Sequence, residues 1–143
     1  MTVRAILDLK GRDVTTILPD KTLGDAASLL SQHKIGALVV TGADRRVTGI
    51  LSERDIVKAV SVDGAAALEE KISARMTREV ITCGPHDTMA DLMGRMTAGR
   101  FRHLPVVENG RLVGIISIGD VVKHRLAEME RESSALRDYI MTA

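Results

Sequence analysis

The fold is decided by a ten-residue stretch that occurs twice, as G-I-L-S-E-R-D-I-V-K at Gly49–Lys58 and as G-I-I-S-I-G-D-V-V-K at Gly114–Lys123. The second copy lies 65 residues after the first. Upstream, P-D-K-T-L-G-D at Pro19–Asp25 returns 66 residues later as P-H-D-T-M-A-D at Pro85–Asp91. Segments that recur in the same order at nearly the same spacing indicate an internal duplication.

Each copy predicts the same elements. Thr22 and Thr88 are candidate N-cap residues, each with an Asp three residues later, and apolar residues follow at helical spacing. Two apolar runs then predict a pair of strands joined by a turn, and Asn109-Gly110 is typical of a tight hairpin. A second helix is expected to begin near Glu53 and again near Ile118.

The duplication predicts an α/β (α+β) fold of two pseudo-symmetric β-α-β-β-α repeats stacked through their sheets. One repeat is too small to bury its own sheet, so a cleft is expected where the two meet. The predicted organisation is a lead-in over residues 1–13, a first repeat over 14–60, a linker over 61–79, a second repeat over 80–125 and a C-terminal helix extension over 126–143.

Composition excludes several classes of function. The 143 residues are 45% hydrophobic and 27% charged, with a net charge of only +1, one Phe and one Tyr. That balance offers neither a basic field nor a stacking platform for nucleic acid. No apolar run approaches the roughly 20 residues of a membrane span, and Met1–Lys10 does not look like a signal peptide. Cys83 is the only cysteine, which predicts a buried apolar role. We expect a cytoplasmic protein without nucleic-acid or membrane partners.

The repeated pattern, G-h-h-S-x-x-D with h apolar, suits a ribonucleotide. Glycine allows close approach to the backbone, and a Ser hydroxyl with the free amides of a helix start can donate to phosphate. The Asp can accept hydrogen bonds from ribose hydroxyls. Ser52 and Asp55, or Ser117 and Asp120, could instead be simple capping residues. Because the pattern occurs twice and both copies are expected to face one cleft, we favour ligand binding over simple capping.

These elements, together with I-G-A-L-V-V at Ile35–Val40 and R-H-L-P-V-V at Arg102–Val107, resemble the CBS-domain family, whose tandem pairs are often called Bateman modules. The resemblance extends from about Val14 to His124. It implies a regulatory sensor that binds AMP, ADP or ATP, in some cases NAD(H) or S-adenosylmethionine, and passes occupancy to a partner protein. It also implies a homodimer.

Carried over by position, the resemblance implies two sites. Each takes its ribose-binding Asp from one repeat and its base-binding strand from the other. The first site would comprise Ser52, Arg54, Asp55, Val80, Arg102, His103 and Pro105. The second would comprise Val14, Ile35, Gly36, Ala37, Leu38, Ser117, Gly119 and Asp120.

The two implied sites differ in charge. The family often places Ser or Thr just before the Asp, whereas this chain has Arg54 and Gly119 there. Arg54 and Arg102 can both hold a phosphate through charged hydrogen bonds, while Gly119 offers only its backbone. We therefore expect the Asp55 site to depend more on phosphate.

The sequence gives less support to three other functions: an enzyme, a metal site and an interaction scaffold. Ser117, His103 and Asp120 are the residue types of a catalytic triad, but no G-x-S-x-G elbow is present, so we expect no enzyme. The four scattered histidines do not predict a metal site. The main alternative is a dimeric interaction scaffold with vestigial pockets. Its support is an apolar stripe in the C-terminal helix, which could also rest on its own subunit: Val122, Leu126, Met129, Ser133, Leu136 and Ile140.

Overall fold

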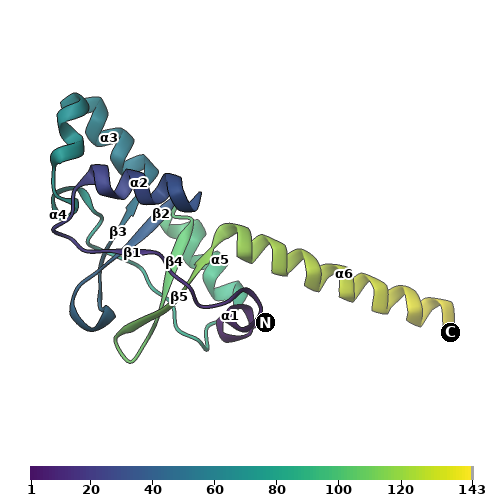
Figure 1. The fold of residues 1–143 in the computed structure, drawn as a ribbon. Helices are drawn as coiled ribbons and strands as arrows, with labels where there is room; N and C mark the ends of the chain where they lie inside the picture. Colours follow the sequence, from purple (N-terminus) through teal and green to yellow (C-terminus); the bar gives the residue numbers. More distant parts are fainter. Residues whose placement is uncertain (143) are drawn as a thin grey trace.

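The computed structural model describes residues 1–142 and contains two repeated units (Figure 1). The first unit runs β1 (Thr16–Ile17), α2 (Leu23–His33), β2 (Ala37–Thr41), β3 (Val47–Ser52) and α3 (Glu53–Asp63). Its sheet has the order β1-β2-β3, with β1 parallel to β2 and β2 antiparallel to β3. The predicted β-α-β-β-α order is confirmed for this repeat.

The second unit has α5 (Met89–Gly99), β4 (His103–Glu108), β5 (Arg111–Ser117) and α6 (Ile118–Thr142). Its expected first strand is reduced to a single parallel bridge between Cys83 and Val106. The strand stops there because the next amide, that of Gly84, donates to the Asp87 carboxylate at 2.7 Å and turns the chain. The β4–β5 turn has positive φ at both Asn109 (53°) and Gly110 (77°), as the hairpin signal predicted.

Polar side chains begin the helices where the sequence placed them. Thr22 and Thr88 each accept a hydrogen bond from the amide three residues on, and Asp25 and Asp91 accept one in return from the cap amide. These backbone hydrogen bonds to Thr22 and Thr88 lower the pKa of Asp25 and of Asp91. Each repeat therefore starts its first helix with a reciprocal capping box.

Each repeat has its own apolar core, and the segments outside the repeats complete those cores. α1 (Val3–Lys10) buries Val3, Ile6 and Leu7 in the core of the second repeat. The segment after the short 3-10 helix at Gly64–Glu69, which includes α4 (Ile72–Arg75), packs Ile72 into the core of the first repeat. The lead-in and the linker thus play the same structural role for opposite repeats.

Backbone hydrogen bonds make this equivalence explicit. The amide of Ile72 donates to the Lys21 carbonyl at 2.8 Å, and the amide of Val3 donates to the Asp87 carbonyl at 2.9 Å. Two further pairs of bonds match in the same way. The Ser73 amide donates to the Pro19 carbonyl as the Arg4 amide donates to the Pro85 carbonyl. The Leu23 amide donates to the Glu70 carbonyl as the Met89 amide donates to the Met1 carbonyl. Residues 1–10 therefore correspond to residues 70–79, at an offset of 69.

Two glycines of the repeated motif fit this packing. A Cβ added to Gly49 would lie 2.6 Å from the sulfur of Met76, and one added to Gly114 would lie 2.7 Å from Cδ2 of Leu7. Met76 and Leu7 are also 69 residues apart. Glycine is thus favoured at this position in both repeats, because an added Cβ would force the apolar side chain that rests on its backbone to shift.

The sheets of the two repeats meet at the centre of the molecule. All five residues of β2 are buried, which indicates that both faces of this strand are covered. Arg45, in the turn before β3, donates from Nε to the Leu112 carbonyl of β5 at 3.2 Å. α6 instead runs away from the body to the C-terminus (Figure 1). Within residues 1–142, no helix has the length and apolar character that a bilayer span requires.

Candidate functional site

The first Ser-x-x-Asp motif forms the junction between β3 and α3. The Ser52 amide donates to Oδ2 of Asp55 at 2.9 Å, and the Ser52 hydroxyl donates to the same oxygen at 3.1 Å. The Asp55 amide donates to the Ser52 hydroxyl at 3.3 Å. Ser52 and Asp55 therefore do cap the start of α3. The cap uses only Oδ2 of Asp55, and among the described residues Oδ1 accepts no hydrogen bond.

The second motif repeats this geometry between β5 and α6. Oδ2 of Asp120 accepts from the Ser117 amide at 2.9 Å and from the Ser117 hydroxyl at 3.0 Å. Here a cation is added: Nζ of Lys10 lies 2.6 Å from the same Oδ2 and 2.9 Å from the Ile115 carbonyl oxygen. The two motifs therefore match in backbone and differ in charge.

Burial, Lys10 and Ser117 together set the pKa of Asp120. Burial raises the pKa of Asp120, but the hydrogen bond from Lys10 and those from Ser117 outweigh it and leave the pKa below its ordinary value. Lys10 ends α1, and its equivalent in the other repeat, 69 residues later, is Glu79. A carboxylate cannot form an ion pair with Asp55, and among the described residues Asp55 has no ion pair.

A cavity of about 390 Å³ opens beside Asp55, between the two repeats. The first repeat contributes the start of α3, the segment that follows it contributes Thr77 and residues 79–81, and the second repeat contributes the segment from Arg100 to His103. The lining residues are Gly36, Ala37, Ile50, Ser52, Glu53, Arg54, Asp55, Thr77, Glu79, Val80, Ile81, Arg100, Phe101, Arg102 and His103.

Three arginines line this cavity, Arg54, Arg100 and Arg102. None of the three forms an ion pair among the described residues. They accompany the first amides of α3, where the helix dipole is positive. The cavity thus combines donors for an anion with the open oxygen of Asp55, a natural acceptor for hydroxyl groups.

His103 lies where the two motifs approach each other. It pairs with Ser117 across β4 and β5, and its ring lies 3.9 Å from the place of a Cβ on Gly36. Burial lowers the pKa of His103, and the nearby Arg102 lowers it further, against the opposing charges of Asp120 and Glu53. The imidazole is therefore neutral at neutral pH and can both donate and accept a hydrogen bond.

The structure groups the residues assigned from the sequence differently from the two expected sets. Of the set expected around Asp55, Pro105 does not line the cavity, and the other members do: Ser52, Arg54, Asp55, Val80, Arg102 and His103. Gly36 and Ala37, assigned to the Asp120 site, also line it. The others of that set lie outside this cavity: Val14, Ile35, Leu38, Ser117, Gly119 and Asp120.

Gly36 and Ala37 lie beside Asp55 because β2 and β3 are paired, with Ala37 opposite Ser52 and the Glu53 amide bonded to the Gly36 carbonyl at 3.0 Å. Pro105 shares a face of β4 with His103 but lies two residues further along the strand, about 7 Å away, and the cavity lining ends at His103.

Several lining residues were missed by the sequence analysis, among them Glu79, Arg100 and Phe101. Arg100 ends α5 in the left-handed conformation, with φ of 56°, which gives no motif to recognise. Glu79 was placed in the linker. Lys10, also missed, was placed in the lead-in. Both residues could have been found only from the correspondence of residues 1–10 with 70–79. The backbone hydrogen bonds show this correspondence, and the sequence does not.

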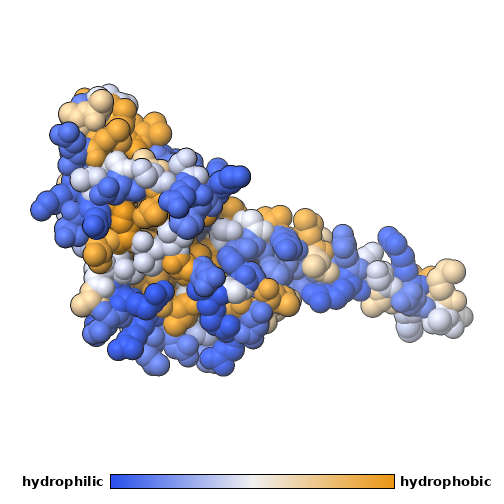
Figure 2. All heavy atoms as spheres, viewed as in Figure 1, coloured by the Kyte–Doolittle hydropathy of each residue, from blue (hydrophilic) through white to orange (hydrophobic). Residues whose placement is uncertain are grey.

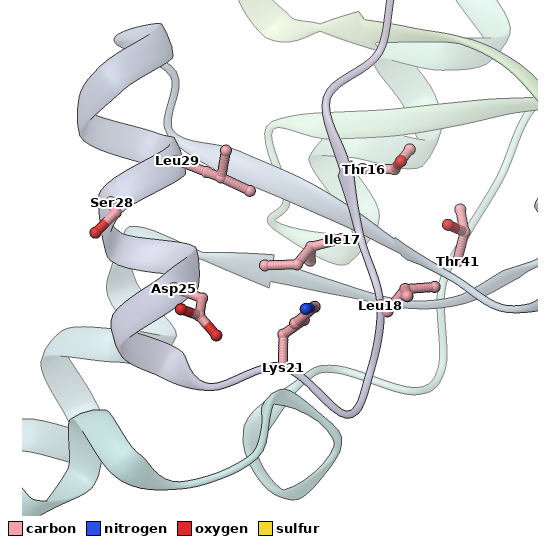
Figure 3. Close-up of a pocket in the computed structure, with 8 residues that line it drawn as sticks. All are labelled: Thr16, Ile17, Leu18, Lys21, Asp25, Ser28, Leu29 and Thr41. Carbon is pink, nitrogen blue, oxygen red and sulfur yellow. The ribbon is translucent and has the colours of Figure 1, made fainter.

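A different cavity, of about 480 Å³, lies between α2 and the edge strand β1, and its lining includes Lys21, Asp25 and Leu29 (Figure 3). The positions equivalent to Lys21 and Leu29 hold Asp87 and Arg95, whose side chains form an ion pair at 2.7 Å. Asp25 is engaged as the capping residue of α2. Because this hollow contains neither Ser-x-x-Asp motif, we do not assign the ligand site to it.

Cys83 behaves as a core residue. It is 4% exposed, and burial raises the pKa of its thiol to about 12. The thiol therefore stays protonated at neutral pH, which suits a packing role and not a reactive one.

Comparison with known proteins identifies the family. The CBS domain family matches the chain twice, over residues 6–62 and 70–127. The chain is 37% identical over 125 residues to the mitochondrial CBS domain-containing protein CBSX3 of Arabidopsis thaliana, and this match covers 85% of the chain and 61% of the relative. The chain thus spans about three fifths of that relative.

Solved structures share the fold. A CBS-domain containing protein from Agrobacterium tumefaciens superposes with a TM-score of 0.84 at 58% identity, covering 87% of this chain and 99% of that one. A CBS domain protein from Pyrobaculum aerophilum was solved with AMP (TM-score 0.75, 28% identity, 84% and 89% of the two chains). The pair of protein MJ0100 was solved with 5′-methylthioadenosine and S-adenosyl-L-methionine (0.79, 25%, 90% and 98%). The matched motifs, the repeated fold and these likenesses place the chain in the CBS-domain family, with two CBS repeats.

Proposed function

We propose that the chain is a regulatory module that binds an adenine nucleotide in the cavity beside Asp55 and transmits its occupancy to a partner protein. The observation that carries the proposal is that Asp55, which has an open Oδ1 and no ion pair among the described residues, lies in a cavity that three arginines also line. Relatives with AMP, methylthioadenosine and S-adenosylmethionine support adenosine as the shared part of the ligand.

The residues divide the nucleotide between them. Asp55 accepts from the ribose hydroxyls through Oδ1, since Oδ2 is held by Ser52. Arg54 and the amides of the first turn of α3 face the 5′-phosphate, because a guanidinium makes strong paired hydrogen bonds to phosphate. The apolar members of the lining, Val80, Ile81 and Phe101, offer contact for the base. The candidate ligands are AMP, ADP and ATP, with NAD(H) as a further possibility that shares the adenosine 5′-phosphate.

The Asp120 junction is proposed as the weaker site. A ribose there meets a carboxylate already paired with Lys10, and Gly119 provides no side chain for phosphate. Ligand binding at Asp120 has to compete with, or rearrange around, a charged hydrogen bond of 2.6 Å. We therefore expect one high-affinity nucleotide per chain.

Isothermal titration of the purified chain with AMP, ATP, NADH and adenosine tests this function. We expect saturable heat with at least one nucleotide, near one equivalent per chain, and loss of affinity when adenosine replaces AMP. Bound nucleotide should also raise the melting temperature, since ligand at a hundred times its Kd stabilises the folded state by about 2.7 kcal/mol. No heat and an unchanged melting curve with all four compounds would overturn the sensor.

The second candidate function is a dimeric interaction scaffold with empty pockets. The observation that favours it is α6, whose apolar residues Leu126, Met129, Leu136 and Ile140 are between 50% and 64% exposed. A scaffold and a sensor are distinguished by the same titration, because only the sensor binds nucleotide.

A further inference from the structure

The outer part of α6 is a helix without packing partners in its own chain. From Met129 to Thr142 every residue is exposed. Just before this stretch, Glu128 forms ion pairs with Arg125 and with the amino group of Met1. An isolated helix of this length is marginal in water, because helix nucleation is costly and propensity alone adds little. Figure 2 shows apolar side chains among charged ones along this helix. Such a helix gains stability by covering its apolar side.

Five of the exposed apolar residues of α6, together with Ser133, lie on one continuous seam. They follow one another at alternating steps of four and three residues, which is the heptad spacing of a coiled coil. With Leu126, Ser133 and Ile140 at the a positions, the d positions are Val122, Met129 and Leu136. All but Ser133 are apolar and at least 50% exposed. The seam therefore suits a second helix with the same spacing.

The charged residues beside the seam decide which helix that is. The g positions include Arg125 and Glu132, and the e positions include Glu130 and Arg137. In a parallel pair each g residue faces the e residue five positions later in the other helix. A second copy of α6 in parallel would therefore bring Arg125 to the partner's Glu130 and Glu132 to the partner's Arg137, and each pair has opposite charges.

The antiparallel arrangement fails on the same charges. Matching its apolar layers places Leu126 opposite the partner's Leu136. This register brings Glu130 beside the partner's Glu130 and Glu132 beside the partner's Glu132. Like charges at these positions oppose pairing.

We propose that α6 pairs in parallel with α6 of a second copy of this chain through the seam Val122–Ile140. The pairing holds two nucleotide modules at the same end of a short coiled coil. Ser133 lies at the middle of the seam, where it faces its own counterpart. This polar position and the length of the seam, under three heptads, make the contact a reversible one. The interaction adds an assembly role to the chain and is independent of whether the cavity binds nucleotide.

Cysteine cross-linking of the full chain tests the orientation. Leu136→Cys and Ile140→Cys should each form disulfide-linked dimers under mild oxidation, because a parallel pair places each position beside its own counterpart. In an antiparallel pair those positions would be about 15 Å and about 27 Å from their counterparts, at 1.5 Å per residue. The wild-type chain, whose only cysteine is buried Cys83, is the matched control and should stay unlinked. Dimers that form only when Leu126→Cys and Leu136→Cys chains are mixed would overturn the parallel arrangement.

A charge swap tests the partner. Sedimentation equilibrium should show that Arg137→Glu weakens self-association by at least several-fold, because it places Glu132 beside a second carboxylate. The double variant Glu132→Arg/Arg137→Glu should restore it, since the interhelical pair is rebuilt with reversed sign. Helicity at dilution should follow the same order. A chain that is monomeric throughout, or a dimer that is indifferent to both variants and forms no cross-links, would exclude the seam as the interface.

Discussion

The two Ser-x-x-Asp junctions are nearly identical in backbone and opposite in electrostatic setting. Both Asp residues accept from the Ser amide at 2.9 Å, and the hydroxyl contacts differ by only 0.1 Å, 3.1 against 3.0 Å. Asp120 also holds the ammonium of Lys10, whereas the equivalent residue beside Asp55 is Glu79. The duplicated motif keeps what folding requires, a capped helix start, and the flanking segments give its two copies different charged neighbours.

The largest expected effect concerns the claim that α1 completes the second repeat. Leu7→Ala should lower the free energy of unfolding by about 2–5 kcal/mol, because Leu7 is 1% exposed and rests on Gly114. Leu9→Ala, on the same helix but 69% exposed, is the matched control and should change it little. Urea denaturation measures both. Equal stabilities for the two variants would show that α1 does not contribute to the core of the second repeat.

The next effect sharpens the difference in phosphate binding. Arg54→Ala should weaken AMP binding by about 1.5–3 kcal/mol, the usual worth of a hydrogen bond to a charged group. Adenosine, which lacks the phosphate, should bind the variant and the wild type alike. Lys58→Ala removes a positive charge from an exposed position of α3 outside the cavity lining and serves as control. An unchanged AMP affinity in Arg54→Ala would indicate that Arg100 or Arg102, and not Arg54, contacts the phosphate.

A smaller effect tests the ribose assignment at both junctions. Asp55→Asn should reduce the preference for AMP over 2′-deoxy-AMP, because an amide is a poorer acceptor than a carboxylate for the ribose hydroxyls. Asp120→Asn should change that preference much less if the Asp55 site holds the tight nucleotide. Competition titrations measure the ratio. A wild-type ratio in both variants would mean that the two aspartates only cap helices.

The smallest effect concerns the Lys10–Asp120 pair itself. Lys10→Met should cost no more than about 1 kcal/mol at neutral pH, since both side chains remain partly exposed. The folded-state pKa of Asp120 is lowered, so its contribution is present above the carboxyl's unfolded pKa and is lost as pH falls through the folded value. The stability difference between variant and wild type should therefore shrink in acid.

Arg12→Met, which breaks an exposed pair with Asp8, is the control for Lys10→Met. The Lys10 variant should also bind a second equivalent of AMP more tightly, because the Asp120 carboxylate is freed. A second site that stays silent after Lys10 is removed would show that Gly119, not the lysine, is what weakens it.

The fold could be predicted from the sequence because its signals are local and occur twice. Capping residues such as Thr22 and Thr88, the Asn109-Gly110 turn and the repeated apolar runs each act over a few residues, so periodicity alone reveals them. Because Ser52, Arg54 and Asp55 share one helix start, the sequence could also predict that they lie together. The strand expected around Cys83 is shorter than predicted, because the Gly84 amide donates to the Asp87 side chain and the chain turns there.

The sequence by itself determined the duplication, the order of elements and the two motifs, since these depend on spacing along the chain. The tertiary structure alone decided which of the two Asp residues is paired with a lysine, because that depends on Lys10 meeting Asp120 across 110 residues of sequence. It also moved Gly36 and Ala37 to the Asp55 cavity through strand pairing. Contacts between distant segments follow from how the two repeats and their flanking helices pack, and no local pattern records them.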